Sequence, residues 1–491
     1  MADKNSSRLI PPSNDGMHIP DMATALTPCD MDNVTTHVEK IKKLAGNISP
    51  SDVATRHQLL EAARSLVRAL ETPRETMIKH CWAQPAAMTA LTLGVDVGLF
   101  HAMAADGGSS KTTADLAQRV GVETAVITRI VRHLGAMGYV IETGQDEYKP
   151  TKFTMALCIP SISAGYPVLS GGLLSANNKF HEFMRKTNYK MPTNMTDGPL
   201  QYAYNTKLNM FEHLQANPPY GQLFNDHMAG YRQGRASWMD EGIFPVKERL
   251  IDGFEGDGGA AFLVDIGGSI GHDIQEFLHK YPSPPGRLIL QDLPVVIGQI
   301  KSLDEKIERM GYDFTTEQPV KGSRAYYMHS VLHDWPDETC MKILARITEA
   351  MKPGYSKLLI NENVIPARGA YWESTALDVL MMLYFTSKER TEQEWRALLG
   401  AAGLKICKIW SAGEGVESLI ELILKFKLAE RVFFEFIWYS RCGVNVEVDD
   451  GSAWPDLRLD HWRDPRPPRL QKQHFNACSA SPLFKPTTNL W

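Results

Sequence analysis

The sequence is poor in cysteine, and its cysteines show no metal-binding or disulfide pattern. Seven cysteines are spread over 491 residues, and none forms a Cys-x-x-Cys motif. An odd number of widely separated thiols argues against a disulfide framework and against a zinc ribbon. We therefore expect a protein of a reducing compartment, located in the cytoplasm.

The chain also lacks a strong excess of charge and a long apolar run. Its formal net charge is −5, so the overall charge gives no argument for binding nucleic acid. No segment approaches the roughly 20 apolar residues of a membrane-spanning helix. The first residues, MADKNSSRLIPPSNDG, have no apolar stretch typical of a secretory signal. We expect neither a nucleic-acid partner nor a membrane partner.

What the chain does contain is enough apolar sequence, 43% of its residues, to fold as two or three domains. Composition and periodicity divide it into five segments. The predicted segments are a disordered N-terminus (1–33), a helical and winged-helix dimerisation domain (34–160), a helical substrate-covering segment (161–250), a catalytic domain (251–425) and an atypical C-terminal tail (426–491).

A winged-helix pattern is expected between Lys111 and Thr151. Two short helices separated by a glycine precede a hairpin of two short strands. DNA binding is one interpretation of this pattern. The second helix, however, carries few basic groups, namely Arg129, Arg132 and His133, whereas a helix that reads a DNA groove needs a stronger positive field. A dimerisation or substrate-covering role is therefore favoured.

From Ala261 onward, strands alternate with helices, which predicts an α/β fold with a Rossmann-like, doubly wound parallel sheet. The expected strands are AFLVDI, RLILQD, AYYMHSVL and KLLINENVI, and a helix is expected over IGQIKSLDEKIERMG. Ligands in such sheets bind beyond the carboxyl ends of the strands. The residues that follow each strand are therefore the candidates for the site.

Three strand ends point to a nucleoside ligand. Gly267 and Gly268 permit a tight turn after the first strand, and Asp292 ends the second at the position expected for a ribose contact. Asp313 and Phe314 pair an acid with an aromatic ring, which suits an adenine base. In the pattern DxGGxxG an acid stands at the strand end, where a dinucleotide site has to bind phosphate, and a carboxylate there would repel the phosphate. S-adenosylmethionine is therefore favoured over NAD.

A candidate general base follows the next strand. His333, with Glu362 and Glu389 at comparable places further along, could accept a proton while the two acids orient the ring. Taken alone, each residue has a simpler interpretation. His333 could be a buried structural histidine, Glu389 could cap a helix or pair with Arg390, and Asp334 could cap the helix that follows. We find no dedicated acid cluster for Mg²⁺ and expect no metal.

Together these motifs resemble the S-adenosylmethionine-dependent O-methyltransferases of the caffeic-acid type, which need no cation. The similarity is greater to their fungal secondary-metabolite relatives, and it covers the chain from about Leu60 to Lys425. It is carried by six motifs in the family's order, which are DIGGSIG, QDLPVVI, YDFTTEQP, LHDWPDE, INENVIP and KERTEQEW.

The resemblance implies a role for each residue. His333 matches the base that deprotonates a substrate hydroxyl, with Glu362 and Glu389 as its flanking acids, and Met381 matches a residue that lines the substrate pocket. The implied contacts to S-adenosylmethionine are Gly267, Gly268, Asp292, Asp313, Phe314, His329 and Trp335. A homodimer and a small aromatic substrate are also implied.

The sequence departs from the family pattern at three places. His329 stands where the family usually has Lys or Arg near the cofactor. The segment between Met381 and Lys388 is one residue shorter than in the plant enzymes and lacks their asparagine. Residues from about 426 onward match no known part of the family.

The main hypothesis is methyl transfer to a phenolic or enolic hydroxyl of a small aromatic secondary metabolite. Two alternatives remain. The fold could bind S-adenosylmethionine and perform non-methylating chemistry, such as a cyclisation or pericyclic reaction. The chain could also be a DNA-binding regulator that uses the winged helix.

Overall fold

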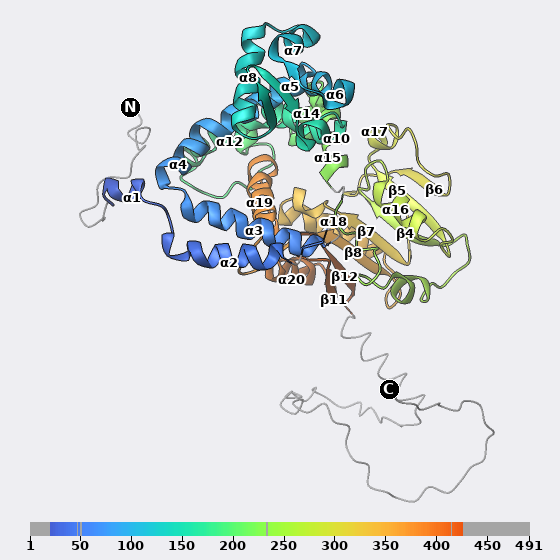
Figure 1. The fold of residues 1–491 in the computed structure, drawn as a ribbon. Helices are drawn as coiled ribbons and strands as arrows, with labels where there is room; N and C mark the ends of the chain where they lie inside the picture. Colours follow the sequence, from blue (N-terminus) through green and yellow to red (C-terminus); the bar gives the residue numbers. More distant parts are fainter. Residues whose placement is uncertain (1–19, 47, 50–51, 232–233, 414, 426–491) are drawn as a thin grey trace, which may run out of the picture. The chain divides into compact units, whose positions relative to one another are not determined.

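The structure is a computed structural model that describes residues 20–46, 48–49, 52–231, 234–413 and 415–425 (Figure 1). The predictions for residues 1–19 and for the tail from 426 lie outside these ranges. The chain begins with helices and short helical turns: α1 (Met22–Leu26), η1 (Met31–Asn33), α2 (Val34–Ala45), α3 (Val53–Leu70), α4 (Pro73–Ile78), η2 (Lys79–Ala83), α5 (Gln84–Asp96) and α6 (Leu99–Gly108). Helix α1 and turn η1 fall within the segment that was expected to lack fixed structure.

The helix–turn–helix–hairpin pattern predicted from the sequence is present. Its elements are β1 (Lys111–Thr112), α7 (Thr113–Val120), α8 (Thr124–Ala136), β2 (Val140–Gly144) and β3 (Glu147–Pro150), with the strands in the order β1-β3-β2. Thr112 caps α7 by accepting a hydrogen bond from the backbone N–H of Asp115. Gly121 ends the helix with a φ of 68°, a conformation that favours glycine.

A mostly helical segment follows the hairpin. It consists of α9 (Lys152–Ala156), α10 (Pro160–Ser163), α11 (Gly165–Pro167), η3 (Val168–Leu173), α12 (Leu174–Lys186), α13 (Pro199–Tyr204), α14 (Met210–Ala216), α15 (Tyr220–Tyr231) and η4 (Lys247–Ile251). Buried side chains of η3, α12, α13 and α14 form one cluster with helix α19 (Trp372–Phe385), which belongs to the later part of the chain. The helical segment is therefore packed against an element of the α/β region.

The α/β region contains a seven-stranded, mostly parallel sheet in the order β11-β12-β8-β7-β4-β5-β6 (Figure 1). Its strands are β4 (Ala261–Ile266), β5 (Arg287–Asp292), β6 (Ile307–Gly311), β7 (Ala325–His329), β8 (Lys357–Glu362), β11 (Leu404–Ser411) and β12 (Ser418–Leu424). Strands β4 to β8 run parallel, whereas β12 is antiparallel to β8 and β11 is antiparallel to β12. The predicted Rossmann-like sheet is confirmed.

The prediction of a helix over IGQIKSLDEKIERMG is wrong. Helix α17 (Pro294–Ile297) ends where that segment begins, and Ile307–Gly311 forms the strand β6. This strand pairs in parallel with Leu288–Asp292 of β5, and Ile307 is buried against the sheet. Pairing with a neighbouring strand outweighed the helical propensity of the charged residues.

Both faces of the sheet are buried, which explains the continuous apolar runs in the sequence. One face packs against α18 (Asp337–Ala350) and α20 (Glu392–Ala401), in a core that includes Val264 and Tyr326. The opposite face packs against α16 (His272–Lys280), in a core that includes Leu263. Among the described residues no single helix could cross a membrane; only α4–α5 and α6 taken together, bent by 72°, reach the length and hydropathy of a span.

Candidate active site

A glycine loop joins β4 to α16 at the carboxyl edge of the sheet. Gly267 has a φ of 70°, and a Cβ there would lie 2.9 Å from Cγ2 of Val331. A Cβ on Gly268 would lie 2.5 Å from the Leu290 side chain and 2.6 Å from that of Asp265. Both positions therefore require glycine, and the backbone of the loop stays bare toward a ligand.

Asp292 braces this loop from the end of β5. Its Oδ2 accepts a hydrogen bond from the N–H of Ser269 at 2.8 Å, and its Oδ1 accepts one from the N–H of Leu293 at 2.7 Å. Burial raises the pKa of Asp292, although these two hydrogen bonds oppose that effect. The residue predicted to contact ribose thus lies directly beside the glycine loop.

The residues predicted to contact adenine also lie near one another. The rings of Phe314 and Trp335 meet edge to face, with centroids 5.7 Å apart. The Asp313 carboxylate accepts hydrogen bonds from the N–H and the hydroxyl of Thr315, which fixes the start of this turn. An acid and an aromatic ring are therefore brought to the same edge as the glycine loop.

His333 lies in a short turn, η5 (Leu332–Asp334), just beyond β7. Its side chain is buried, and Nδ1 lies 2.7 Å from Oε1 of Glu389. An ionised carboxylate can only accept, so Nδ1 carries a proton and the neutral ring keeps its lone pair on Nε2. The nearest carboxylate to Nε2 is Oδ1 of Asp334, at 3.5 Å.

Glu362, the last residue of β8, holds the backbone of this turn. Its Oε1 accepts hydrogen bonds from the N–H groups of Val331 at 3.0 Å and Leu332 at 2.8 Å. Its Oε2 lies 3.7 Å from Nδ1 of His333. Glu362 and Glu389 thus approach the same ring nitrogen, so both predicted acids flank the predicted base.

The electrostatics of this cluster are dominated by burial and by the three acids. Burial lowers the pKa of His333, but Glu362, Asp334 and Glu389 outweigh it and raise that pKa well above the usual value. Burial raises the pKa of Asp334 to about 7, with the nearby histidine opposing the rise. Burial also raises the pKa of Glu362. His333, Asp334 and Glu362 therefore each hold a proton more tightly than they would in water.

The structure excludes two of the simpler interpretations. The residue preceding α18 is Pro336, and no side-chain cap is made there, so Asp334 does not cap the helix. Glu389 does not pair with Arg390, because Arg390 binds Asp337 instead. The backbone N–H of Glu389 donates to Asp378 on α19, which fixes its position.

His329, at the end of β7, is engaged by two other acids. Its Nδ1 lies 2.7 Å from Oδ2 of Asp273, and its Nε2 lies 3.1 Å from Oε2 of Glu417. Both ring nitrogens are therefore directed at carboxylates of the protein. The geometry makes His329 a link between α16 and the start of β12, which was not foreseen from its place in the sequence.

Met381 lies on α19 among the apolar side chains that α19 shares with α12, α13 and α14. The cluster includes Phe385 and Met210, and Phe211 packs on Phe385 with ring centroids 5.4 Å apart. Helix α19 also contacts the turn that carries His333. The residue predicted to line a substrate pocket is thus part of an apolar, aromatic surface that approaches the base.

The spacing of the central cluster would also suit a cation. One ligand atom each of His333, Glu362 and Glu389 lies within 4.8 Å of the others. The sequence grouped the same three residues as a base and its flanking acids, and no metal was expected there. Oε1 of Glu362 is, however, already engaged by backbone N–H groups of the turn.

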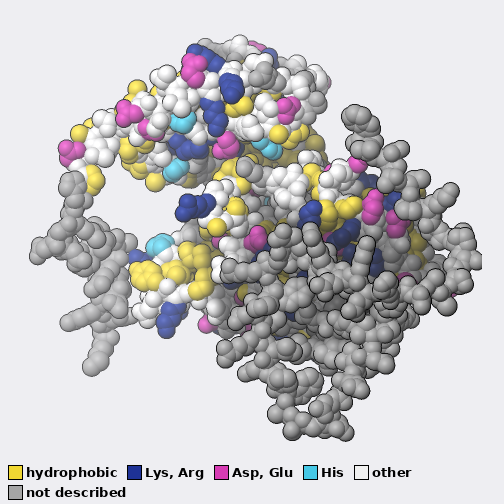
Figure 2. Space-filling model, turned by 90° about the horizontal axis from the view of Figure 1, so that it is seen from below, with side chains coloured by type: hydrophobic (Ala, Val, Ile, Leu, Met, Phe, Trp, Pro, Cys, Tyr) yellow, Lys and Arg dark blue, Asp and Glu magenta, His cyan; other side chains and the backbone are white. Residues whose placement is uncertain are grey.

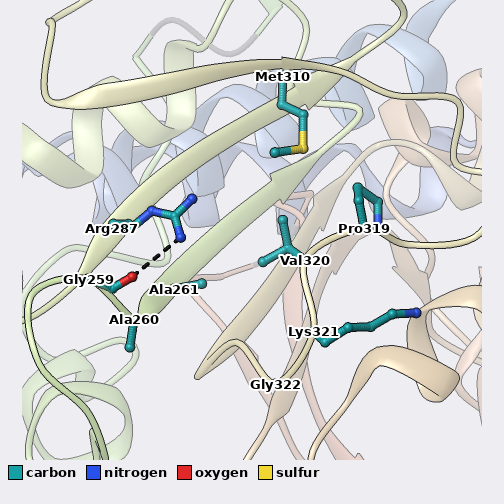
Figure 3. Close-up of a pocket in the computed structure, with 9 residues that line it drawn as sticks. All are labelled: Gly259, Ala260, Ala261, Arg287, Met310, Pro319, Val320, Lys321 and Gly322. Atoms are coloured by element: carbon teal, nitrogen blue, oxygen red, sulfur yellow. Dashed lines mark hydrogen bonds between the residues drawn. The ribbon is translucent and has the colours of Figure 1, made fainter.

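A hollow of about 400 Å³ lies at the opposite ends of the same strands (Figure 3). It is lined by Ala261 and Arg287, which begin β4 and β5, and by Lys321. Arg287 donates to the carbonyl of Gly259, as Figure 3 shows, and pairs with Glu308 at 2.6 Å. None of the predicted site residues lines this hollow, so we place the chemistry at the carboxyl edge.

Comparison with known proteins shows the family of the chain. Residues 202–405 match the family described as an O-methyltransferase domain. The chain is 38% identical over 376 residues to the O-methyltransferase mfmE of Annulohypoxylon moriforme, which spans 77% of this chain and 92% of that protein. The chain belongs to the O-methyltransferase family. It is an enzyme that depends on S-adenosylmethionine.

Solved structures of similar proteins extend the comparison. OxaC in complex with SAH and oxaline superposes with a TM-score of 0.71 at 30% identity, covering 80% of this chain and 99% of that one. A structure described as a pericyclic reaction enzyme superposes with a TM-score of 0.72 at 28% identity, covering 80% of this chain and all of that one. This O-methyltransferase therefore shares its fold with a protein that binds SAH and oxaline and with a pericyclic reaction enzyme.

The glycine loop fits the cofactor that the family uses. A Cβ at Gly267 or Gly268 would meet the side chains of Val331, Leu290 and Asp265, so the loop keeps a bare backbone that a ligand can approach. Asp292 adds a partly buried carboxylate beside it, suited to accepting from hydroxyl groups. On this fit, the glycine loop and Asp292 are the residues that would hold S-adenosylmethionine, with Phe314 and Trp335 predicted beside its adenine.

Several residues of the site were missed in the sequence analysis. Asp378 accepts a hydrogen bond from the backbone N–H of Glu389, and Ser387 and Arg390 donate to carbonyls of the chain around His333. Arg390 was considered only as a partner for Glu389. The sequence does contain a clue, because Arg390 directly follows Glu389, a predicted catalytic acid, and lies five positions before Trp395.

Proposed function

We propose that this enzyme transfers a methyl group from S-adenosylmethionine to a phenolic or enolic hydroxyl of a small aromatic secondary metabolite, with His333 as the general base. The observation that carries the proposal is the 2.7 Å contact between Nδ1 of His333 and Glu389 inside a buried site. Because this contact holds the proton of the neutral ring on Nδ1, Nε2 is the nitrogen that accepts a proton. General-base assistance of this kind accelerates a reaction by roughly 10²–10⁴-fold.

The residues of the chain divide the work. Bound S-adenosylmethionine supplies an electrophilic methyl group on a sulfonium. Nε2 of His333 accepts the hydroxyl proton as the substrate oxygen becomes nucleophilic, and Glu389 stabilises the imidazolium through Nδ1. Glu362 fixes the turn and adds a second negative charge beside the ring. Exclusion of water strengthens these interactions.

The buried apolar cluster near the base supports a flat, apolar substrate. Met381, Phe385 and Tyr384 of α19 pack with Met210 and Leu214 of α14 in one buried cluster. Pockets for small organic ligands are lined in this way, with a few polar groups to fix orientation. The hydroxyl of Tyr384, bonded to Asn177, is such a polar group.

Incubation with S-adenosylmethionine labelled in its methyl group and a panel of phenolic metabolites tests the proposal. We expect label in at least one product with the wild type. We expect His333→Ala to lower kcat by roughly 10²–10⁴-fold while S-adenosylhomocysteine still binds. Equal transfer by the two proteins would show that His333 is not the base.

A second candidate is a pericyclic or cyclising reaction on the same fold. It is favoured by one observation, the superposition on the pericyclic reaction enzyme with a TM-score of 0.72. The same experiment separates the two candidates. Consumption of a substrate without transfer of label, unchanged in His333→Ala, would support the second.

We further propose that the enzyme is a homodimer. Helix α2 buries none of its side chains, and Val53, Leu60, Val67 and Leu70 of α3 are exposed. Figure 2 shows hydrophobic side chains gathered on the face seen from below. Sedimentation should give a dimer for the wild type and a monomer for Val67→Lys combined with Leu70→Lys.

A further inference from the structure

We propose that Arg390 is a positioning residue that holds the backbone of the turn carrying His333. Its guanidinium group is 1% exposed. Nη1 donates to the carbonyl of Leu332 at 2.9 Å, and Nη2 donates to the carbonyl of Trp335 at 3.0 Å. These carbonyls lie on either side of His333 in the chain. The inference rests on the proposed function of His333 as the base.

Arg390 is itself fixed by two neighbours. Nε and Nη2 donate to Oδ1 of Asp337 at 3.0 and 2.7 Å. The guanidinium lies over the ring of Trp395, 5.1 Å from its centroid. A planar group with five donors can satisfy these directions at once, whereas a lysine ammonium offers one point of charge. The requirement is therefore for arginine and not merely for a positive charge.

Other side chains bond the same two carbonyls. Sγ of Cys340 lies 3.2 Å from the carbonyl oxygen of Leu332 and 3.3 Å from that of Trp335, so its single S–H is shared between them, and Oγ of Ser387 donates to Trp335 at 2.9 Å. Burial raises the pKa of the Cys340 thiol to about 12, so it stays a neutral donor. Arg390, Cys340 and Ser387 thus hold the carbonyls of the turn.

The N–H groups of the turn are held from a different element. Glu362 accepts from Val331 and Leu332. Two residues beyond Glu362, strand β9 (Val364–Ile365) pairs with β10 (Arg390–Thr391). The acid that holds the N–H groups and the arginine that holds the carbonyls are therefore joined by a short strand pair.

The order of residues 389 and 390 links the two tasks. Glu389 orients the imidazole ring, and the next residue fixes the backbone from which that ring extends. A displacement of the turn would move Nε2 away from the substrate hydroxyl. Misplacement of a reacting group by about 1 Å can cost roughly 10²-fold in rate.

Arg390→Ala, measured with and without added guanidinium ion, tests this inference. We expect kcat to fall by about 10²-fold with little change in KM, and guanidinium to restore about tenfold of the loss. Arg390→Lys keeps a buried charge and should fold, yet it should recover only part of kcat. Arg396→Ala is the matched control, because Arg396 lies on α20, which directly follows the strand of Arg390, is exposed and pairs with Glu392.

A second readout is independent of turnover. The Nδ1 proton of His333, bonded to Glu389, should give a far-downfield proton resonance that is lost in Arg390→Ala and returns with guanidinium. The inference is overturned if Arg390→Lys keeps wild-type kcat and the resonance. It is also overturned if guanidinium rescues neither signal in folded Arg390→Ala. Absence of methyl transfer by the wild type, with the resonance behaving as expected, would instead overturn the proposed function.

Discussion

Two histidines four positions apart, His329 and His333, are each placed between acids, but they differ in what their ring nitrogens contact. His329 is the last residue of β7 and directs both nitrogens at carboxylates, of Asp273 and Glu417. His333 lies in the turn beyond the strand and has a 2.7 Å carboxylate partner at Nδ1 alone. A proton acceptor needs a free nitrogen, so the geometry suits His333 to chemistry and His329 to structure.

The difference shows that a histidine with nearby acids is not by itself a catalytic pattern. The number of ring nitrogens that carboxylates of the protein engage decides whether the ring can accept a proton from a substrate. A ring nitrogen that is already engaged by a carboxylate of the protein is not available to a substrate proton. His329 therefore holds α16 and the start of β12 together.

The largest effect in this comparison is expected when the charge of an acid beside His333 is removed. Glu389→Gln should lower kcat by about 10²-fold, because the imidazolium loses its charged partner. The wild-type rate should rise with pH as His333 loses its proton, at a pH above the usual pKa of histidine. Removing one acid lowers that pKa, so the rising limb should move to lower pH. A pH–rate profile that does not move would contradict the assignment.

The next effect should appear at His329 and should concern stability more than turnover. His329→Gln removes the ring from between two buried carboxylates, whose side chains are each 6% exposed. Removing one partner of a buried hydrogen bond in this way costs about 1–3 kcal/mol of the free energy of unfolding. Denaturant unfolding measures this loss. If kcat fell strongly while the free energy of unfolding stayed unchanged, His329 would take part in the reaction and would not merely stabilise the fold.

The smallest expected effect is that of removing metal ions. His333, Glu362 and Glu389 have a spacing that could hold a cation. We nevertheless expect EDTA to leave turnover unchanged, because the proposed base needs its ring nitrogens for hydrogen bonding and proton transfer. Turnover assays before and after chelation measure this. Loss of activity on chelation, with recovery on adding Mg²⁺ or Zn²⁺, would make the cluster a metal site.

The positions of the site residues along the sheet could be predicted because strand ends are readable from sequence. Buried apolar runs end at Ile266, Asp292 and Glu362, and parallel strands bring such ends to one edge. Strand β6 could not be predicted, because Ile307–Gly311 lies at the edge of the sheet and is half polar. Its strand conformation depends on pairing with β5, which no local pattern encodes.

The sequence by itself determined the class of the fold, the family, and His333 with Glu362 and Glu389 as the central group, since residue order and strand periodicity carry that information. Tertiary structure alone decided which nitrogen of each histidine is engaged, that Asp334 approaches Nε2 of His333, and that Arg390 donates to a carbonyl of the turn that carries His333. The physical reason is that hydrogen-bond partners are chosen among residues brought together by folding. Arg390 lies 58 positions from Leu332 in the chain and 2.9 Å from its carbonyl in the structure.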